Sequence, residues 1–373
     1  MMNEIFTASD RAIPSWLDDR DARSAIVLSS RVRFARNLAG YPFVSRLTPK
    51  ESAEILDMVT MAITKEPFLQ EIFPKTNFIT LNKITPLKAE FLMERHLISP
   101  DFIRQITKLD STKTANGTGR GVFISPDETI TLMVNEEDHL RFQVLSSGFD
   151  FKSGFAKLNE IDDRLESVLR YAYSSQYGFL TACPSNVGTG LRASVLIHLP
   201  GLVLTKEIEK TLRSIWQINY AVRGLFGEGT ETRGYFFQIS NTITLGQSES
   251  EIIEGIEKIT EQLIAYEQKA REYLLKHTKI ELEDKVFRAY AILKSARIIS
   301  SEETLNLLAT VRLGVALNLI KDISFATLNK IMLLLRPANL QIFYNQEMSP
   351  AERDEKRASL IQQLLSQSQN QSV

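Results

Sequence analysis

The chain has little cysteine, little histidine and almost no net charge. Its single cysteine excludes an intrachain disulfide and fits a reducing compartment. A formal net charge of −1 over 373 residues gives no general reason to expect binding to nucleic acid or to a membrane. No stretch reaches the ~20 apolar residues that a membrane span requires, and residues 1–16 carry early acidic residues without an apolar run. We therefore expect no secretory signal and a cytoplasmic protein.

The remaining composition is that of an ordinary globular protein, with 43% hydrophobic and 24% charged residues. Residues 25–28 predict a strand that leads into a basic loop, SSRVRFARN. Residues 104–121 are rich in Thr, Lys and Gly and predict a mobile loop. The apolar periods predict helices over 50–72, 155–177 and 205–221, and strands over 78–81, 121–124, 130–135, 193–204 and 234–245.

After residue 248 the pattern is helical throughout. Segments with an apolar stripe follow one another, and several begin with Ser or Thr followed three residues later by Glu, as in a capping box. We therefore place a boundary near residue 260. It divides the chain into an arm over 1–24, a mixed α and β domain over 25–260 and an all-helical domain over 261–373.

Two segments of the mixed domain suggest chemistry. Residues 183–194, CPSNVGTGLRAS, combine a cysteine, a glycine-rich turn and an arginine, and residues 135–141, NEEDHLR, combine two glutamates with another arginine. Arginines neutralise phosphate oxygens, glycines let the backbone approach them, and paired carboxylates bind magnesium or a cationic substrate. The segments therefore predict a site for a polyphosphate and a cation, although an isolated arginine or glutamate pair is usually only a solvated surface charge.

Five arginines stand out because each adjoins an apolar strand pattern and a Gly, Ser or Glu. We expect them in loops at strand ends, where ligand sites are commonly built. The five are Arg31, Arg33, Arg141, Arg192 and Arg223. The histidines His139, His198 and His277 are too scattered for a metal site, and we expect them to be structural.

Four motifs in this order, SSRVRFARN, NEEDHLR, CPSNVGTGLRASV and RGLFGEGTE, resemble the ATP:guanidino phosphotransferase family, which includes the creatine and arginine phosphagen kinases. The resemblance implies an α+β fold with an antiparallel sheet flanked by helices, followed here by a helical bundle. Only about thirty residues precede Arg31, too few for the helical domain that phosphagen kinases carry there. With HLISP at 96–100 and QISNTITLGQSE at 238–249, the chain is similar to bacterial protein-arginine kinases (McsB type) over nearly its whole length.

The resemblance implies transfer of the γ-phosphoryl group of ATP to arginine side chains of proteins. Glu137 would clamp the guanidinium and act as general base, and Glu228 would be the second carboxylate that grips it. Glu136 would hold Mg²⁺ through water. Cys183 would lie beside the guanidinium and tune the site rather than act as a covalent nucleophile; the alternative is a buried, inert cysteine.

The resemblance also implies an ATP site in which the five arginines clamp the phosphates and His96 lies near the adenine or ribose. Backbone amides of 193–196 and 224–227 would add contacts. The full implied set is Ser30, Arg31, Val32, Arg33, His96, Arg141, Arg192, Ala193, Ser194, Val195, Leu196, Arg223, Gly224, Leu225, Phe226 and Gly227.

In the helical domain RDEKRA, residues 353–358, resembles a phospho-arginine pocket formed by Arg353, Asp354, Arg357 and Ala358. The alternative is a surface helix with salt bridges at i,i+4 spacing. By resemblance the partners are proteins with exposed arginines, a small zinc-binding activator, a Clp-type ATPase and a second copy of the chain. The activity would mark proteins for degradation in a stress response. Rival hypotheses are a phosphagen kinase acting on free arginine or creatine, and a non-catalytic phospho-arginine-binding adaptor.

Overall fold

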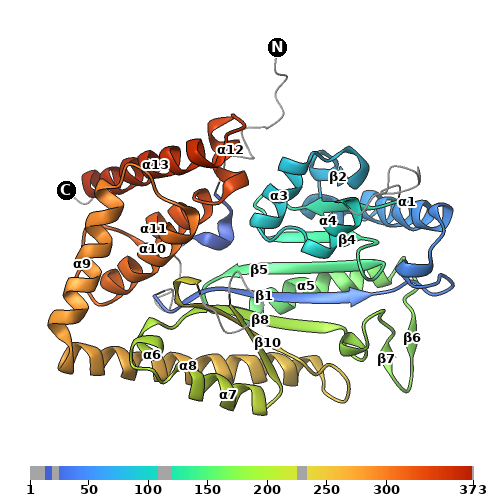
Figure 1. The fold of residues 1–373 in the computed structure, drawn as a ribbon. Coiled ribbons are helices and arrows are strands. Elements are labelled where there is room, and N and C mark those ends of the chain that lie inside the picture. Colours follow the sequence, from blue (N-terminus) through green and yellow to red (C-terminus); the bar gives the residue numbers. More distant parts are fainter. Residues whose placement is uncertain (1–12, 19–24, 108–118, 225–232, 372–373) are drawn as a thin grey trace.

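The computed structural model describes residues 13–18, 25–107, 119–224 and 233–371. Over these residues eight strands form one antiparallel sheet in the order β2-β3-β4-β5-β1-β8-β10-β9 (Figure 1). The predicted fold class, an antiparallel sheet flanked by helices and followed by a helical region, is confirmed. The strands are β1 (Val27–Arg36), β2 (Phe78–Thr80), β3 (Gly121–Ile124), β4 (Ile130–Val134), β5 (Leu140–Ser147), β8 (Leu191–His198), β9 (Tyr220–Gly224) and β10 (Phe236–Asn241), with a separate hairpin of β6 (Tyr173–Ser174) and β7 (Gly178–Phe179).

The helices either flank the sheet or follow it in the sequence (Figure 1). The first group is α1 (Pro49–Lys65), α2 (Pro67–Ile72), α3 (Pro86–Glu94), α4 (Pro100–Thr107), α5 (Phe151–Glu166), α6 (Pro200–Leu204), α7 (Ile208–Gln217) and α8 (Glu249–His277). The second group is α9 (Lys279–Ser295), α10 (Ser301–Ala316), α11 (Phe325–Leu334), α12 (Pro337–Tyr344) and α13 (Pro350–Gln371).

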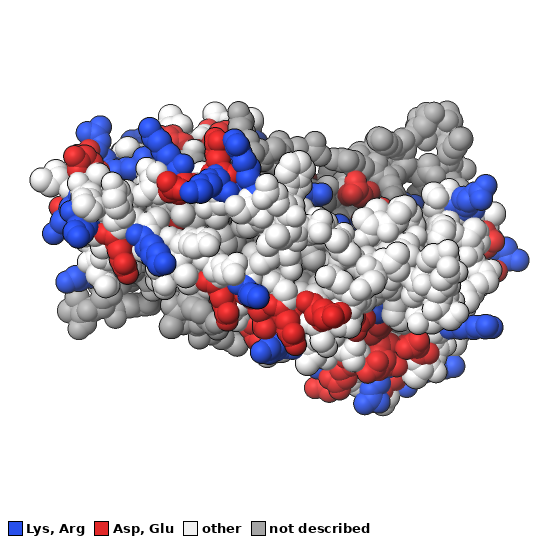
Figure 2. Space-filling view, turned by 90° about the horizontal axis from the view of Figure 1, so that it is seen from below, with Lys and Arg blue, Asp and Glu red and all other residues white. Residues whose placement is uncertain are grey.

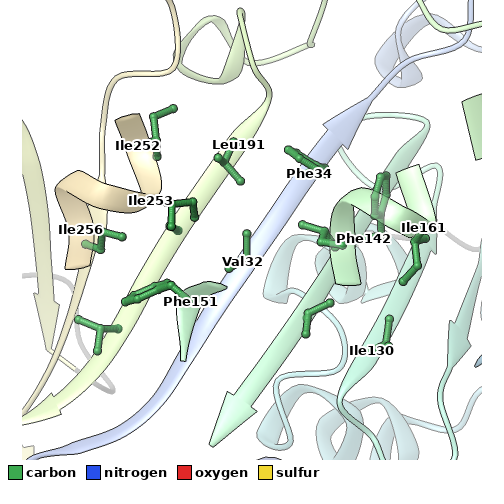
Figure 3. Close-up of a cluster of buried hydrophobic side chains, with 14 of the residues drawn as sticks. Val32, Phe34, Ile130, Phe142, Phe151, Ile161, Leu191, Ile252, Ile253 and Ile256 are labelled. Carbon is green, nitrogen blue, oxygen red and sulfur yellow. The ribbon is translucent and has the colours of Figure 1, made fainter. Parts of the chain in front are cut away.

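Side chains alternate along each strand, so each strand presents one set of residues to α5 and α8 and the other set to the opposite face of the sheet. Val32 and Phe34 of β1 are buried on the face that α5 and α8 cover. Ile161 of α5 and Ile253 of α8 lie over this face, among the buried side chains drawn in Figure 3. Burial of each such side chain stabilises the fold by about 1.5–3 kcal/mol. The helix layer therefore holds the sheet from one side, and the alternate residues of each strand point to the other.

Two expectations about the arginines are wrong. The basic loop predicted after residue 28 is the continuation of β1 to Arg36. From Arg31 to Phe34 charged and buried apolar residues alternate, which is the period of a strand with one apolar face covered. Arg141, Arg192 and Arg223 likewise lie within β5, β8 and β9 instead of in loops at strand ends.

Most other elements lie where the periods predict them, with shifted ends. Pro67 divides the helix predicted over 50–72 into α1 and α2. The helix predicted over 205–221 shrinks to α7, because Asn219 takes a positive φ of 63° and the chain turns into β9. The strand predicted over 193–204 ends at His198, since Pro200 begins α6.

The remaining predicted segments are placed as follows. The helix predicted over 155–177 is α5, which begins at Phe151 after the N-cap Asp150 and ends at Glu166. The strands predicted in 78–81, 121–124, 130–135 and 234–245 are found as β2, β3, β4 and the shorter β10. Residues 104–107 of the expected loop are helical in α4. Residues 108–118 lie outside the described residues.

The C-terminal helices have a core of their own, with Val286, Leu308, Ile331 and Ile361 among its buried side chains. The long helix α8 joins this region to the sheet layer and is continuous through residue 260. The domain boundary there stays a prediction. Of the predicted N-terminal arm, the described part places Trp16 and Leu17 in a buried cluster with Leu145 of β5 and Leu333 of α11.

Seen from below, the molecule carries Asp and Glu in clusters near its middle, and Lys and Arg are more frequent toward the C-terminal helices (Figure 2). The helices in the described parts of the chain include none that is both long and apolar enough to cross a membrane.

Candidate active site

The strand register gathers the five arginines on the face of the sheet opposite to the one that α5 and α8 cover. Arg33 of β1 lies opposite Arg192 of β8, and Arg141 of β5 lies opposite Ala35, two residues along the same face. Arg31 lies opposite Ser194, and Arg223 of β9 lies opposite Gln238 of β10. Residues far apart in the sequence thus meet on four strands of one sheet.

These arginines repel one another. Burial and the charges of Arg141, Arg192 and Arg223 lower the pKa of Arg31 to about 10. Burial and neighbouring arginines also hold the pKa of Arg33 well below its ordinary value, and burial and Arg223 lower the pKa of Arg192. In the described part of the chain, the buried Nε atoms of Arg33 and Arg192 have no hydrogen-bond partner. Unpaired donors and unbalanced positive charge on one face fit a polyanionic ligand.

Glu136 is buried and bound to Arg141. Nη1 of Arg141 donates to both carboxylate oxygens of Glu136 at 2.9 Å, Ser99 Oγ donates to one of them, and the backbone N–H of Glu137 donates to the other at 2.8 Å. Burial alone would raise the pKa of Glu136, but Arg141 and these donors lower it. Conversely, burial alone would lower the pKa of Arg141, and Glu136 raises it. The pair is therefore ionised.

The predicted magnesium role of Glu136 can be tested on these contacts. A carboxylate accepts about four hydrogen bonds, and described residues already donate four to Glu136, two of them from the one nitrogen Nη1 of Arg141. Among the described residues no three His, Cys, Asp or Glu side chains form a group that could hold a metal. Mg²⁺ usually retains several waters and binds through substrate phosphates and one or two carboxylates. The described residues therefore fit an ion held mainly by the phosphates of a nucleotide, and the predicted role of Glu136 in holding Mg²⁺ through water stays a prediction.

Glu137 points outward beside this pair. Its side chain is exposed, unlike those of Glu136 and Asp138. Desolvation and the negative charges of Asp138 and Glu136 raise the pKa of Glu137, and Arg141 opposes them. A carboxylate with a raised pKa is a better proton acceptor. This is the property that the predicted general base needs.

Asp138 was not predicted, although it follows the two glutamates directly. Its buried Oδ1 accepts hydrogen bonds from Asn37 Nδ2 and from the backbone N–H of Ala182, both at 2.6 Å. It thereby joins the glutamate turn to the end of β1 and to the segment that carries Cys183. Cys183 is partly exposed rather than buried, and its Sγ lies 3.1 Å from Ser185 Oγ. Burial, Arg223 and Arg141 lower the pKa of Arg192, and Cys183 and Glu137 oppose this, so both lie near its guanidinium.

His96 reaches the arginine face from the loop after α3. Its ring lines a small cavity with Arg31, Ser194 and Gln238, and lies 5.8 Å from the Trp16 ring. Burial and the charges of Arg31 and Arg336 lower the pKa of His96 to about 3. The imidazole is therefore neutral at physiological pH and able to hydrogen-bond a base or a ribose. His139 is structural as expected, because its Nδ1 accepts from Leu38 N and its Nε2 contacts Pro42 O, both at 2.9 Å.

Part of the predicted ATP set lies on the other face of the sheet from the arginines. Ser30, Val32, Ala193 and Val195 lie on the helix-covered face, because they alternate with the arginines along β1 and β8. Ser30 Oγ donates to Gly148 O at 3.1 Å and accepts from Asp150 N at 3.0 Å, which holds the start of α5.

The backbone contacts predicted from 193–196 stay a prediction; β8 is an interior strand that pairs with β1 and β10. Ala193 N, for example, donates to Asn241 Oδ1 at 2.9 Å. Leu196 faces the arginine side but is buried in an apolar cluster with Leu28 and Phe236. Gly224 is the last residue of β9. The predicted residues Leu225, Phe226, Gly227 and Glu228 lie outside the described residues.

The RDEKRA segment is only partly exposed, with Glu355 and Lys356 exposed and Arg357 and Ala358 buried. The Arg357 side chain is 2% exposed, with Nε donating to Leu335 O and Nη1 donating to Ile299 O, both at 2.8 Å. Nη1 also pairs with Asp354 Oδ1 at 2.5 Å. Arg353 Nη1 donates to Met348 O at 2.9 Å, and Ala358 is buried in the helical core.

A sheet face of arginines beside one buried and one exposed glutamate defines a phosphotransferase site of the guanidino type, and the sequence comparisons agree. Residues 55–270 match the model of the ATP:guanido phosphotransferase C-terminal catalytic domain. The chain belongs to this family. Residues 279–373 match the model of the protein-arginine kinase McsB C-terminal domain.

Two relatives extend over nearly the whole chain. The protein-arginine kinase of Pelotomaculum thermopropionicum is 44% identical over 93% of this chain and 94% of its own length. That of Bacillus subtilis is 42% identical over 95% of this chain and 94% of its own length. Among solved structures, a lombricine kinase is 24% identical with a TM-score of 0.54 and covers 70% of each chain, which supports the fold.

Proposed function

We propose that this kinase transfers the γ-phosphoryl group of ATP to arginine side chains of proteins. The observation that carries the proposal is the five-arginine sheet face, which lies beside an exposed glutamate of raised pKa. Residues 279–373, which follow the catalytic sheet, match the protein-arginine kinase McsB C-terminal domain. This match supports a protein as the substrate.

The arginine face would hold the ATP phosphates. Binding of a polyphosphate would relieve the repulsion that lowers the pKa of Arg31, Arg33 and Arg192. The same charges would stabilise the transferring group, whose negative charge spreads over its equatorial oxygens. When bound, Mg²⁺ would neutralise charge on the β- and γ-phosphates, with Glu136 holding its water shell.

The acceptor is a guanidinium group, which is protonated and poorly nucleophilic in water. Glu137 would orient it and accept a proton as a guanidinium nitrogen bonds to the γ-phosphorus. The bond from that phosphorus to the β,γ-bridging oxygen breaks, and ADP leaves. Glu228 would be the second carboxylate, and Cys183 would tune the guanidinium from its place near Arg192. His96, neutral and partly buried, would contact the adenine or ribose.

The wider role follows from the resemblance. Phospho-arginine would mark cytoplasmic proteins for a Clp-type protease during stress, with a zinc-binding activator as partner and a homodimer as the working form. Arg353, Asp354, Arg357 and Ala358 would form a phospho-arginine pocket through which the enzyme senses its product.

A transfer assay separates the proposal from its rivals. Purified full-length chain is incubated with ATP, Mg²⁺ and either an unfolded protein, free arginine or creatine, and acid-labile phosphate is measured, with Glu137→Gln as the inactive control. We expect phosphate on arginines of the unfolded protein, and none on free arginine or creatine. Transfer to free arginine or creatine would identify a phosphagen kinase, and absence of transfer with retained phospho-arginine binding would identify an adaptor.

A further inference from the structure

The loop that carries His96 is bound directly to the C-terminal helices. Glu94, the last residue of α3, accepts hydrogen bonds from the backbone N–H groups of Ala338 and Asn339 at 3.0 and 2.9 Å. These are the first-turn N–H groups of α12, which would otherwise have no partner in that helix. Glu94 therefore caps a helix that lies about 240 residues further along the chain.

Asn339 completes this contact with its side chain. Its Nδ2 donates to Glu94 Oε2 at 2.8 Å, and its Oδ1 accepts from Arg95 Nε at 2.9 Å. Arg95 also binds Glu128 at 2.8 Å, and its guanidinium lies 4.3 Å from the centre of the Phe91 ring. Asn339, Glu94 and Arg95 are all buried. One amide thus holds two consecutive residues of the loop, in a place where a lost partner leaves buried polar groups unpaired.

His96 follows these two residues and has a backbone conformation that needs such support. Its φ is +60°, a left-handed conformation that costs a non-glycine residue roughly 1–2 kcal/mol. Gln143 of β5 donates to His96 O at 2.5 Å, which fixes the other side of the loop. A strained residue keeps its conformation only when its surroundings determine it.

The His96 ring lies between the two parts of the molecule. One small cavity places it beside Arg31, Ser194 and Gln238 of the sheet face, and another places it beside Glu94 and Arg336. Arg336 is the N-cap of α12, so the same helix end contacts Glu94 and approaches the ring. The position of α12 therefore determines where the ring stands relative to the arginine face.

We propose that Asn339, acting through Glu94 and Arg95, is a positioning residue for the nucleotide site. The C-terminal helices thereby form part of the ATP site, although they contribute none of its phosphate ligands. The inference rests on the proposed function only in taking His96 as a nucleotide contact. Because the phosphates and the acceptor are held by the sheet, loss of Asn339 affects nucleotide affinity and leaves the chemical step largely intact.

The test compares two amides on one helix. Asn339→Ala removes the side-chain contacts to Glu94 and Arg95. The matched control is Gln341→Ala, because Gln341 is also buried in α12. The Gln341 side chain donates to Pro337 O and accepts from Met348 N, and neither hydrogen bond involves residues 94–96. ATP and ADP affinity is measured by calorimetry on the full chain, together with KM for ATP, kcat and thermal unfolding. We expect about tenfold weaker nucleotide binding for Asn339→Ala, about 1.4 kcal/mol, with kcat within about twofold and near wild-type binding for Gln341→Ala.

Equal nucleotide binding by the two variants, or an unchanged KM with a reduced kcat in Asn339→Ala, would overturn the inference. If Asn339→Ala does not fold, Glu94→Gln keeps the side-chain volume and one acceptor oxygen, and must show the same selective loss of affinity for the inference to stand. Failure of the proposed function is a separate result, since it would appear as absent nucleotide binding or transfer in the wild-type chain.

Discussion

Replacing Asp138 by Asn or by Ala tests how the glutamate turn is held. Oδ1 of Asp138 accepts from both Asn37 Nδ2 and Ala182 N. An Asn side chain can keep its oxygen in that position and retain both contacts, whereas Ala removes them. Asp138→Ala leaves the buried N–H of Ala182 without this acceptor, which costs about 1–3 kcal/mol. Asn37 Nδ2 loses one hydrogen bond, worth about 1 kcal/mol, and keeps its contact to Leu180 O. We therefore expect a loss of roughly 2–4 kcal/mol of stability.

The two variants should also differ in catalysis. In Asp138→Ala the glutamate turn and the Cys183 segment lose their link, and a misplacement of about 1 Å typically costs roughly 10²-fold in rate. In Asp138→Asn the geometry stays, but Glu137 loses a neighbouring negative charge that raises its pKa. The ionised base then persists to lower pH, so the acid limb of kcat/KM moves toward lower pH.

The assay is kcat/KM for the protein substrate across pH, with thermal unfolding of each variant. An equal loss of activity in both variants at every pH would show that the charge of Asp138 matters and its bridging contacts do not. An acid limb that moves to higher pH in Asp138→Asn would contradict the electrostatic argument.

Three further changes test the other groups of the site. Glu137→Gln keeps the side-chain size and removes the proton acceptor, so we expect a loss of about 10²–10⁴ in kcat; near wild-type kcat would rule out its role as base. Arg192→Ala should lower kcat more than it weakens ATP binding, because charge develops on the transferring group, and an effect confined to KM for ATP would make Arg192 a simple binder. Cys183→Ser should retain reduced activity and resist thiol reagents, whereas complete inactivity or a trapped phospho-cysteine would indicate covalent catalysis.

The sequence predicted the residue types of the site better than their positions. Each arginine motif is visible in the sequence, but whether Arg31 and Arg33 lie in a loop or a strand depends on α5 and α8, which cover Val32 and Phe34. The same alternation places Ser30 and Ala193 on the face opposite to the arginines. Such errors arise because a period-2 pattern interrupted by two arginines resembles a basic loop until the covering helices are known.

Contacts between distant segments could not be predicted at all. Nothing local to Glu94 indicates that it caps α12, since its partners are Ala338 and Asn339. Asp138 stood next to the predicted glutamates, yet its role depends on Asn37 and Ala182, which only the fold brings together. The sequence therefore predicted chemistry where it is encoded in a motif, and missed it where a buried hydrogen bond joins two parts of the chain.

The RDEKRA motif shows how burial changes the meaning of a residue. The sequence predicted that Arg353 and Arg357 contribute equally to one phospho-arginine pocket. In the structure Nε and Nη1 of Arg357 bind Leu335, Ile299 and Asp354, so that side chain already joins α13 to the end of α11 and to the segment before α10. A phosphoryl group could engage Nη2 of Arg357 only while this framework stays in place. Loss of Arg357 would disturb the end of α11, and with it Arg336 at the start of α12, whether or not phospho-arginine binds. Among the described residues the Arg353 side chain has one hydrogen bond, to Met348 O, and Arg353 is therefore the residue at which product sensing can be separated from helix packing.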